Sequence, residues 1–140
     1  MGLTGRAGLN GHATVLLVDD VHRATAYYRD RLGFEVGHYD QNPSHYAYAE
    51  RDGCHLHFAR FEGATPRPNC REAPPDMFDA YFWVDDVDAL YAELAERGAE
   101  LHGRPELQGY GMYDFRVADP HGYVLAFGRA GSGEAEPESA

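Results

Sequence analysis

The hydrophobic pattern of the chain contains the same junction twice. An apolar run over residues 13–18 ends in Val18-Asp19-Asp20-Val21, and a run over residues 80–84 ends in Val84-Asp85-Asp86-Val87. Each run predicts a β-strand, and each aspartate pair predicts the end of that strand and the start of a helix. Aspartate suits this position because its carboxylate accepts the first free backbone N–H groups at the positive end of the helix dipole. We therefore expect these carboxylates to cap helices rather than to catalyse a reaction.

A helix is predicted after each junction. The first spans residues 20–32 and ends at Gly33, and the second spans residues 86–97 and ends at Gly98. In the first helix the apolar side chains recur at helical spacing and form one buried face. That face consists of Val21, Ala24, Tyr28 and Leu32.

The remaining apolar segments predict strands. They lie at residues 12–19, 34–40, 45–50 and 54–61 in the first half, and at residues 78–84, 99–101, 115–117 and 123–128 in the second. Alternation within residues 45–50 places Tyr46 and Tyr48 on one face of their strand and two alanines on the other. Arg51-Asp52-Gly53 has the composition of a hairpin turn. Each half is therefore β-α-β-β-β, and the fold class is α+β.

A second echo indicates that the two halves are repeats of one module. The pattern Gly-x-x-Leu-x-Phe-x-Arg occurs at residues 53–60 and again at residues 122–129. Two echoes in the same order predict two half-modules that share a core. The expected organisation is a first module at residues 12–61, a proline-rich linker at 62–77, a second module at 78–129 and a disordered acidic tail at 130–140. Together the modules make one domain over residues 12–129.

Composition narrows the class of protein. Hydrophobic residues make up 44% of the 140 residues, which is enough for an ordinary globular core. No apolar run approaches the length of a membrane span, and residues 1–10 lack the apolar stretch of a signal peptide, so we expect a cytoplasmic protein. The two cysteines, Cys54 and Cys70, are isolated, which favours reduced thiols over a disulfide or a zinc site.

The net charge of −11 bears on the partners of the protein. Nucleic acid is a poor partner, because phosphate binding needs a basic surface. An acidic surface attracts cationic partners, although in most acidic proteins it serves only solubility. Charge by itself therefore excludes one class of partner and selects none.

The paired β-α-β-β-β pattern, the Val-Asp-Asp-Val junctions and the terminal Asp-Pro-x-Gly turn at residues 119–122 together resemble the vicinal oxygen chelate superfamily. This superfamily includes glyoxalase I, extradiol dioxygenases and the fosfomycin and bleomycin resistance proteins. The resemblance runs from His12 to about Arg129. It implies the glyoxalase/bleomycin resistance fold, in which curled sheets from two modules enclose a cup, commonly in a homodimer. His121, within the turn, is expected to be exposed to solvent.

Three segments resemble the bleomycin resistance branch in particular. Residues 53–60 are similar to its Leu-His-[Ile/Phe]-x-Arg strand, and residues 113–122 to its R-E-F-x-V-x-D-P-x-G segment. Residues 104–108 also match a P-E-L-Q segment of some members. The resemblance therefore implies a protein that binds an antibiotic.

The metal-using members of the superfamily hold their ion at four positions. By the resemblance these positions correspond to Ala13, His57, Asp79 and Ala126. Alanine has no donor atom, and the remnant of His57 and Asp79 is too small for a catalytic zinc or iron site, which needs about three protein ligands. We therefore expect no cofactor. The alternative is a metal-dependent enzyme, such as a lyase, isomerase or dioxygenase, that uses a non-standard set of His57, Asp79 and His55.

Aromatic residues are abundant, with ten tyrosines, seven phenylalanines and one tryptophan. The resemblance places Tyr46 and Tyr81 where the bleomycin-binding branch carries the aromatic rings that sandwich the drug. Ordinary core packing is the competing explanation for both rings. The full set of expected ligand-binding residues is Tyr46, Tyr48, His57, Tyr81, Trp83, Tyr110, Met112 and Tyr113. Stacking on such rings contributes about 0.5–1.5 kcal/mol each beyond simple burial.

These observations favour a homodimeric protein that sequesters a cationic glycopeptide of the bleomycin type, or a similar aromatic drug, without metal chemistry. An acidic groove would raise the rate of encounter with such a ligand. The sequence leaves open the metal-dependent enzyme and, as a third possibility, a sensor of small molecules. It also leaves open whether the two modules pair within one chain or across a dimer.

Overall fold

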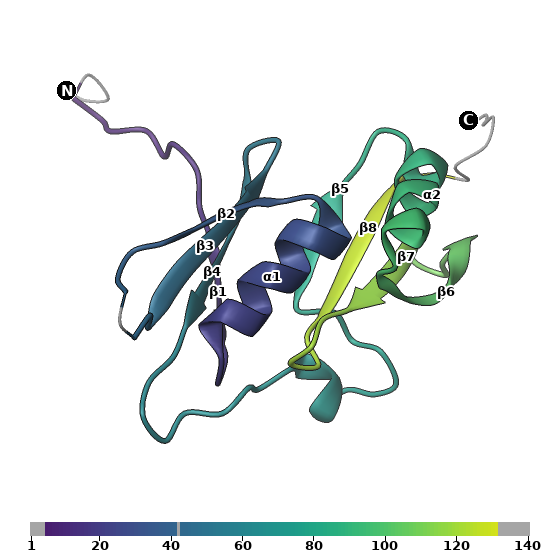
Figure 1. Cartoon of the computed structure of the whole chain (residues 1–140). Coiled ribbons are helices and arrows are strands. Elements are labelled where there is room, and N and C mark those ends of the chain that lie inside the picture. Colours follow the sequence, from purple (N-terminus) through teal and green to yellow (C-terminus); the bar gives the residue numbers. More distant parts are fainter. Residues whose placement is uncertain (1–4, 42, 132–140) are drawn as a thin grey trace.

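The computed structural model describes residues 5–41 and 43–131. Most of the expected disordered tail, at residues 132–140, lies outside these described residues. The elements in chain order are β1 (Thr14–Leu17), α1 (Val21–Leu32), β2 (Glu35–His38), β3 (Tyr46–Arg51), β4 (Cys54–Ala59), β5 (Ala80–Trp83), α2 (Val87–Arg97), β6 (Glu100–Leu107), β7 (Met112–Ala118) and β8 (Val124–Ala130). The expected β-α-β-β-β order therefore occurs twice (Figure 1). A single turn of 3-10 helix, Asn69–Arg71, lies between β4 and β5.

Each module forms a four-stranded mixed sheet with the same topology. The strand orders are β1-β4-β3-β2 and β5-β8-β7-β6. The first strand of each module pairs in parallel with the last, and the other pairs are antiparallel. The predicted α+β fold built from two repeated modules is confirmed.

The helix boundaries follow the capping chemistry of the aspartate pairs. Asp20 Oδ1 accepts the Arg23 N–H at 3.0 Å, and Asp86 Oδ1 accepts the Ala89 N–H at 3.0 Å. Gly33 ends α1 in the left-handed conformation, with φ of 76°. A residue that has a Cβ atom is strained in that conformation, whereas glycine adopts it without strain. The predicted helix-capping role is confirmed for the second aspartate of each pair, Asp20 and Asp86, and not for the first.

The strand β6 is longer than expected. The sequence predicted that it would end at residue 101, before Gly103 and Pro105, but it continues to Leu107. A register shift between His102 and Glu106 accommodates these residues, and Gly103 has φ of 80°. Proline is tolerated because β6 is an edge strand, and one side of an edge strand has no neighbouring strand that needs its N–H groups. The short-strand prediction was therefore wrong.

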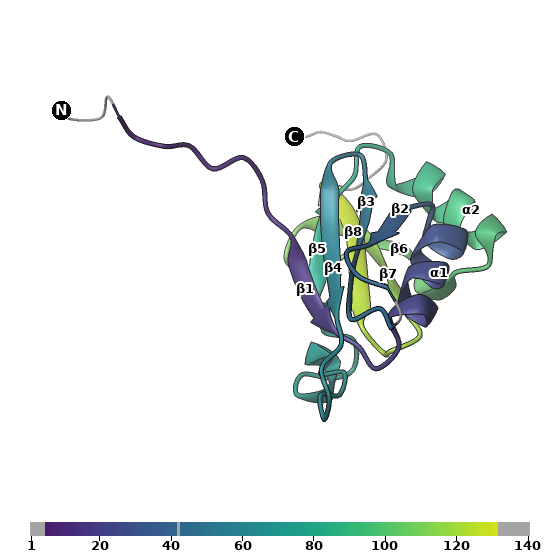
Figure 2. The same cartoon turned by 60° about the vertical axis from the view of Figure 1, so that its left-hand side comes forward.

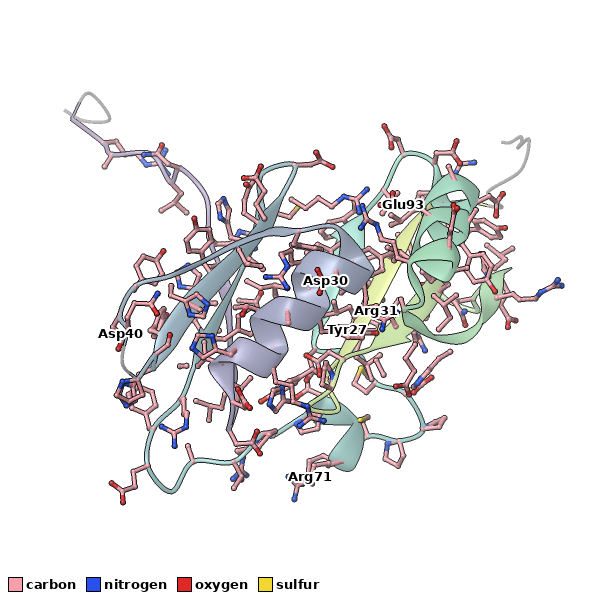
Figure 3. The ribbon with its side chains drawn as sticks, viewed as in Figure 1. Tyr27, Asp30, Arg31, Asp40, Arg71 and Glu93 are labelled. Carbon is pink, nitrogen blue, oxygen red and sulfur yellow. The ribbon has the colours of Figure 1, made fainter. Side chains whose placement is uncertain are left out.

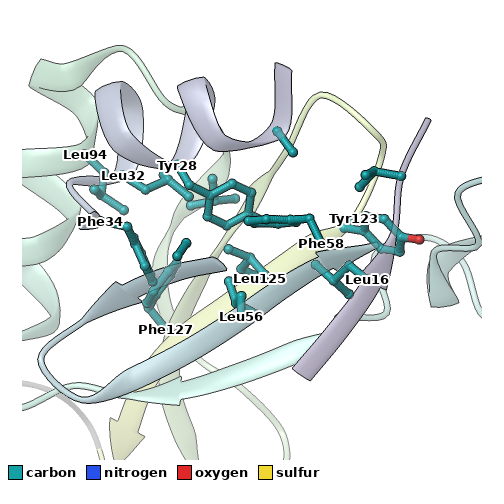
Figure 4. Packing of buried hydrophobic residues seen from close by; sticks show 14 of the residues in the cluster. Leu16, Tyr28, Leu32, Phe34, Leu56, Phe58, Leu94, Tyr123, Leu125 and Phe127 are labelled. Atoms are coloured by element: carbon teal, nitrogen blue, oxygen red, sulfur yellow. The ribbon is translucent and has the colours of Figure 1, made fainter. Parts of the chain in front are cut away.

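The two modules share one hydrophobic core. Figure 2 shows both helices on the same side of the two sheets. The predicted face of α1 is confirmed, since Val21, Ala24, Tyr28 and Leu32 are all nearly inaccessible to solvent. The Tyr28 ring packs against Phe34 and Phe58 of its own module (Figure 4). Phe34 in turn contacts Phe82 of the second module. The core is thus continuous across the module boundary.

The turn between β7 and β8 ties the second module to the first. Buried Asp119 accepts hydrogen bonds from the Tyr28 hydroxyl at 2.8 Å and from the backbone N–H groups of His121 at 2.8 Å and Tyr123 at 3.0 Å. Burial raises the pKa of Asp119 and raises that of Tyr28 well above its usual value. The Tyr27 hydroxyl adds a bond to the Ala118 carbonyl oxygen at 2.8 Å. This joint fixes α1 against the β7–β8 turn.

His121 belongs to the same joint. The sequence predicted an exposed turn residue, but His121 is only 8% exposed, and its Nε2 atom lies 2.9 Å from Asp19 Oδ1 in the first junction. The prediction was wrong because the packing of one module on the other covers the turn. One aspartate of the first Val-Asp-Asp-Val therefore contacts the second module, while its neighbour caps α1.

An ion pair joins the modules at the other end of their boundary. Glu93 projects from α2 (Figure 3) and accepts from both Nη atoms of Arg51, at 2.8 and 3.1 Å. Arg97 donates to the same carboxylate at 2.8 Å, and Arg51 also donates to the Leu32 carbonyl oxygen at 2.8 Å. The hydrogen bonds from Arg51 are the main reason why the pKa of Glu93 lies below its usual value.

No helix in the described part of the chain is long and apolar enough to cross a membrane.

We expect Tyr28→Phe to lower the free energy of unfolding by about 1.5–3 kcal/mol, because it removes a donor from the buried carboxylate of Asp119. Urea denaturation measures the change. Tyr91→Phe is the matched control, since the Tyr91 hydroxyl makes no hydrogen bond within the described residues. Equal stability of the two variants would show that the Tyr28 bond does not hold the joint.

Stability should fall in acid partly through Glu93. A carboxyl group whose pKa is lowered by folding stabilises the folded state above its unfolded pKa, and this contribution is lost as the pH drops through the lower folded value. We expect Glu93→Gln to lose less stability than the wild type between neutral pH and about pH 3, measured by urea denaturation at both pH values. Glu96→Gln, an exposed change on the same helix, should behave as the wild type. Parallel losses in the wild type and Glu93→Gln would contradict the assignment.

Candidate functional site

Each sheet has one face covered by its helix and one face turned away from it, here called the open face. In the first sheet, Val15, His57 and Tyr48 are register partners across β1, β4 and β3, so their side chains share the open face. The residues that alternate with His57, Leu56 and Phe58, are fully buried on the helix side. The predicted candidates of the first module therefore point away from the core.

A cluster of four rings, the tyrosine cluster, covers the first open face. The Tyr39 ring lies 5.6 Å from both Tyr46 and Tyr48 and 5.7 Å from His57. Tyr46 and His57 meet edge to face at 5.3 Å, and the Tyr46 hydroxyl oxygen is 3.0 Å from His57 Nδ1. Edge and tilted contacts at these spacings are the favourable geometries for aromatic pairs. The cluster is held in place by its own contacts.

Gly37 explains how Tyr48 lies flat against its neighbouring strand. A Cβ atom at Gly37 would lie 2.6–2.7 Å from the ring and hydroxyl atoms of Tyr48, closer than real Cβ contacts. The absence of a side chain on β2 therefore lets the ring cover that strand. Tyr39, two residues further along, is 62% exposed and extends the aromatic surface.

The second open face carries a hydrogen-bonded network around a buried carboxylate. Asp114 on β7 is fully buried, and its Oδ2 atom accepts the Tyr81 hydroxyl at 2.9 Å and the Tyr110 hydroxyl at 2.8 Å. The Tyr110 hydroxyl in turn accepts from Arg116 Nη2 at 2.7 Å, and the Arg116 guanidinium lies 5.3 Å from the centre of the Phe78 ring. We call Tyr81, Tyr110, Asp114 and Arg116 the carboxylate network.

The network determines what these tyrosines offer to a ligand. Each gives its only hydroxyl proton to Asp114, so a ligand meets hydroxyl oxygens that accept hydrogen bonds. Burial, followed by the bond to Asp114, raises the pKa of Tyr81 and of Tyr110, so both hydroxyls stay protonated at neutral pH. Asp114 Oδ1 and Arg116 Nε are buried without a protein partner among the described residues. The network thus keeps one acceptor and one donor that are not hydrogen-bonded to any described residue.

Gly128 makes room for this arrangement. A Cβ atom there would lie 2.3 Å from the Tyr81 hydroxyl, 2.4 Å from Asp114 Cβ and 2.8 Å from the Tyr113 carbonyl oxygen. The corresponding residue of the first repeat is Ala59, whose surroundings contain no such network. The repeated Phe-x-Arg segments differ at this residue, alanine in the first and glycine in the second, because their open faces carry different side chains.

The structure places the eight predicted binding residues in three groups. Tyr46, Tyr48 and His57 lie in the tyrosine cluster, while Tyr81, Trp83, Tyr110 and Met112 lie on the second open face. Tyr113 points the other way, since its hydroxyl donates to Asp88 of α2 at 2.7 Å. No hydrogen bond or ring contact joins the two open faces within residues 5–41 and 43–131.

Sequence reasoning missed Tyr39, Asp114 and Arg116. Strand alternation offered a signal, because Tyr39 follows Gly37 by two residues, and Asp114 and Arg116 alternate with apolar Phe115 and Val117. A polar residue at every second position of a predicted strand marks the face that is turned away from the core.

The four positions compared with metal ligands do not make a donor set. Ala13 and Ala126 have no donor atom, and Ala126 is fully buried beside its register partner Tyr81. Both oxygens of Asp79 accept backbone N–H groups, from Asn69 at 2.7 Å and from Val124 at 2.9 Å. The described residues contain no group of three or more His, Cys, Asp or Glu side chains arranged to hold an ion. Asp79 instead pins the linker to the start of β8.

Comparison with solved structures finds the same fold in several proteins, one of which was solved with a bound drug. The bleomycin-binding protein from bleomycin-producing Streptomyces verticillus, solved with copper(II)-bleomycin, is 25% identical, with a TM-score of 0.66 over 90% of this chain and 99% of that one. TioX from Micromonospora sp. ML1 is 20% identical, with a TM-score of 0.66 over 87% and 99% of the two chains. The bleomycin resistance determinant of transposon Tn5 is 22% identical, with a TM-score of 0.66 over 87% and 98%.

The sequence itself gives a family assignment. No curated protein matches it at a significant level. The model of the Glyoxalase/Bleomycin resistance protein/Dioxygenase superfamily, however, matches residues 11–127, which cover the first module, the linker and nearly all of the second module. This match agrees with the repeated β-α-β-β-β topology and with the solved structures. The chain belongs to the glyoxalase/bleomycin resistance protein/dioxygenase superfamily.

Proposed function

We propose that this protein binds a cationic, aromatic antibiotic of the bleomycin type and protects by sequestration rather than by chemistry. The observation that carries the proposal is the pair of aromatic open faces, each preorganised by its own hydrogen bonds. Tyr46 lies in one and Tyr81 in the other, at the two positions that resemble the drug-stacking rings of the bleomycin-binding branch. Likeness to the Streptomyces verticillus protein supports the same assignment.

The electrostatics favour a cationic ligand. The net charge of −11 raises the local concentration of cations around the whole molecule. The tyrosines of the carboxylate network present acceptors, and an ammonium or amide N–H of a ligand would complement them. Trp83 is 76% exposed, and its ring lies 5.6 Å from Tyr81, which extends the aromatic surface available for stacking and cation–π contact.

A second copy of the chain would complete the site. The two open faces make no contact with each other in the described part of the chain, so one ligand touching both needs a different arrangement of modules. The strands β1 and β5 each pair on one side only, which leaves their other edges available. We infer a homodimer in which the first open face of one copy lies opposite the second open face of its partner.

Calorimetric titration with metal-free bleomycin tests the proposal directly. Saturable binding would support it, and an absence of binding at every attainable drug concentration would remove it. Tyr46→Ala and Tyr81→Ala should each weaken binding tenfold or more, a loss of about 1.4 kcal/mol. Leu107→Ala is the control, because Leu107 is exposed on β6 but pairs in register with Tyr113 on the helix side. Unchanged affinity in both tyrosine variants would place the ligand elsewhere.

The carboxylate of Asp114 should matter for affinity although it is buried. Asp114→Asn keeps the size of the side chain, but removes the charge and replaces an acceptor with a donor, so the hydroxyls of Tyr81 and Tyr110 lose their fixed direction. We expect bleomycin to bind roughly tenfold more weakly to this variant, which corresponds to about 1.4 kcal/mol. Glu106→Gln removes the same charge from the register partner on β6 and should change affinity less than about twofold. If both changes weaken binding equally, the effect of Asp114 comes from its charge alone and not from its hydrogen bonds to the tyrosines.

A further inference from the structure

A cleft of about 790 Å³ lies at the boundary between the modules, at the end that the Arg51–Glu93 ion pair spans. Its walls come from the β3–β4 hairpin of the first module and from the start of α2 in the second. Its apolar floor consists of Leu32, Phe34, Phe82, Leu94 and Phe127. A volume of this size is typical of pockets that hold drug-sized molecules.

The charges around the cleft are unbalanced. Arg51 pairs with Glu93 through two hydrogen bonds and lies 3.7 Å from Asp52, while Arg97, which is outside the lining, also pairs with Glu93. The other ionisable carboxylates of the lining are Asp52, Asp85 and Asp86, so the lining keeps a net negative charge. Asp85 makes no hydrogen bond or ion pair with any described residue, and it belongs to the second Val-Asp-Asp-Val junction. In the second junction Asp86 thus caps α2, and the carboxylate of Asp85 remains available to a ligand.

The sign of this charge selects the class of ligand. The N-terminus of α2 by itself would attract an anion, but Asp86 already caps it and two further carboxylates lie nearby. An anion in the cleft would meet the carboxylates of Asp85 and Asp86, neither of which forms an ion pair with a described residue. A cation would be attracted by them, and at the rim it would also meet the indole of Trp83, which is 76% exposed.

We propose that this cleft binds a small organic cation, with its hydrophobic body on the floor of Phe34, Phe82 and Phe127 and its charge toward Asp85 and Trp83. The floor residues lie on the helix side of the sheets, and Trp83 is the one lining residue shared with the open faces. The inference therefore does not rest on the proposed antibiotic site. It gives Asp85 and the module boundary a role in binding.

Tetraphenylphosphonium and tetraphenylborate provide a matched pair of probes, because they have nearly the same size and shape and opposite charge. Trp83 is the only tryptophan of the chain and borders both the cleft and the second open face, so its fluorescence detects binding in the intact protein, and protection of Cys54 assigns that binding to the cleft. We expect the cation to bind saturably and at least tenfold more tightly than the anion. No saturable binding of the cation, or equal binding of the two ions, would overturn the proposal.

Two alanines of α2 locate the charge effect. Ala89 is exposed and lines the cleft, whereas Ala95 is exposed on the same helix and lies outside the lining. Ala89→Lys should weaken tetraphenylphosphonium binding at least tenfold and strengthen binding of tetraphenylborate. Ala95→Lys makes the same change in net charge and should leave both affinities within twofold. Indistinguishable behaviour of these variants would show that the probe senses only the overall charge.

The cysteines give an independent readout of position. Cys54 lines the cleft, and Cys70 lies in the linker beside Gly122. Tetraphenylphosphonium should slow alkylation of Cys54 by a maleimide and leave the rate at Cys70 unchanged. Tyr46→Ala should retain full affinity for the probe, since Tyr46 lies on the first open face. Loss of probe binding in Tyr46→Ala, or protection confined to Cys70, would place the cation outside the cleft.

Discussion

The buried carboxylate of Asp119 is the interaction on which the assembly of this fold depends. A carboxylate removed from water costs several kcal/mol unless its oxygens are hydrogen-bonded. Here two donors come from its own turn, and the third is the hydroxyl of Tyr28 on α1, 91 residues away in the chain. The second module can satisfy this carboxylate fully only by docking on the first. His121 and Asp19 form a parallel link beside it.

Docking at this joint decides which surfaces remain available. Both helices and the inner faces of both sheets are used for one core, so the two open faces are turned away from it. The modules share their topology but have developed these faces differently. The first carries rings in tilted and edge contact around His57, and the second carries tyrosines hydrogen-bonded to Asp114. The same backbone topology thus carries two open faces with different side-chain chemistry.

The positions that correspond to metal ligands in the superfamily have structural roles in this chain. Asp79, which could have remained a ligand, holds the linker and β8 together through two backbone N–H groups. Ala126 provides the flat floor beside Tyr81. Two of the positions that carry donor atoms in the metal-using members therefore have structural contacts here, Asp79 with the backbone and Ala126 with Tyr81.

Much of the fold followed from the sequence by itself. The two aspartate junctions, the glycines that end the helices, the buried face of α1 and the alternation around Tyr46 all depend on residues close together in the chain, where backbone geometry and capping are local. The same local rules placed Tyr46 with Tyr48, and Tyr81 with Trp83, on common faces.

Tertiary structure alone decided the remaining features. The burial of His121, the carboxylate network and the cleft at the module boundary arise from contacts between residues up to 102 positions apart. The full length of β6 became visible only through its pairing with β7, because that pairing accommodates a glycine and a proline that look like a strand end. Local patterns do not encode such contacts, since they depend on how one module packs against the other.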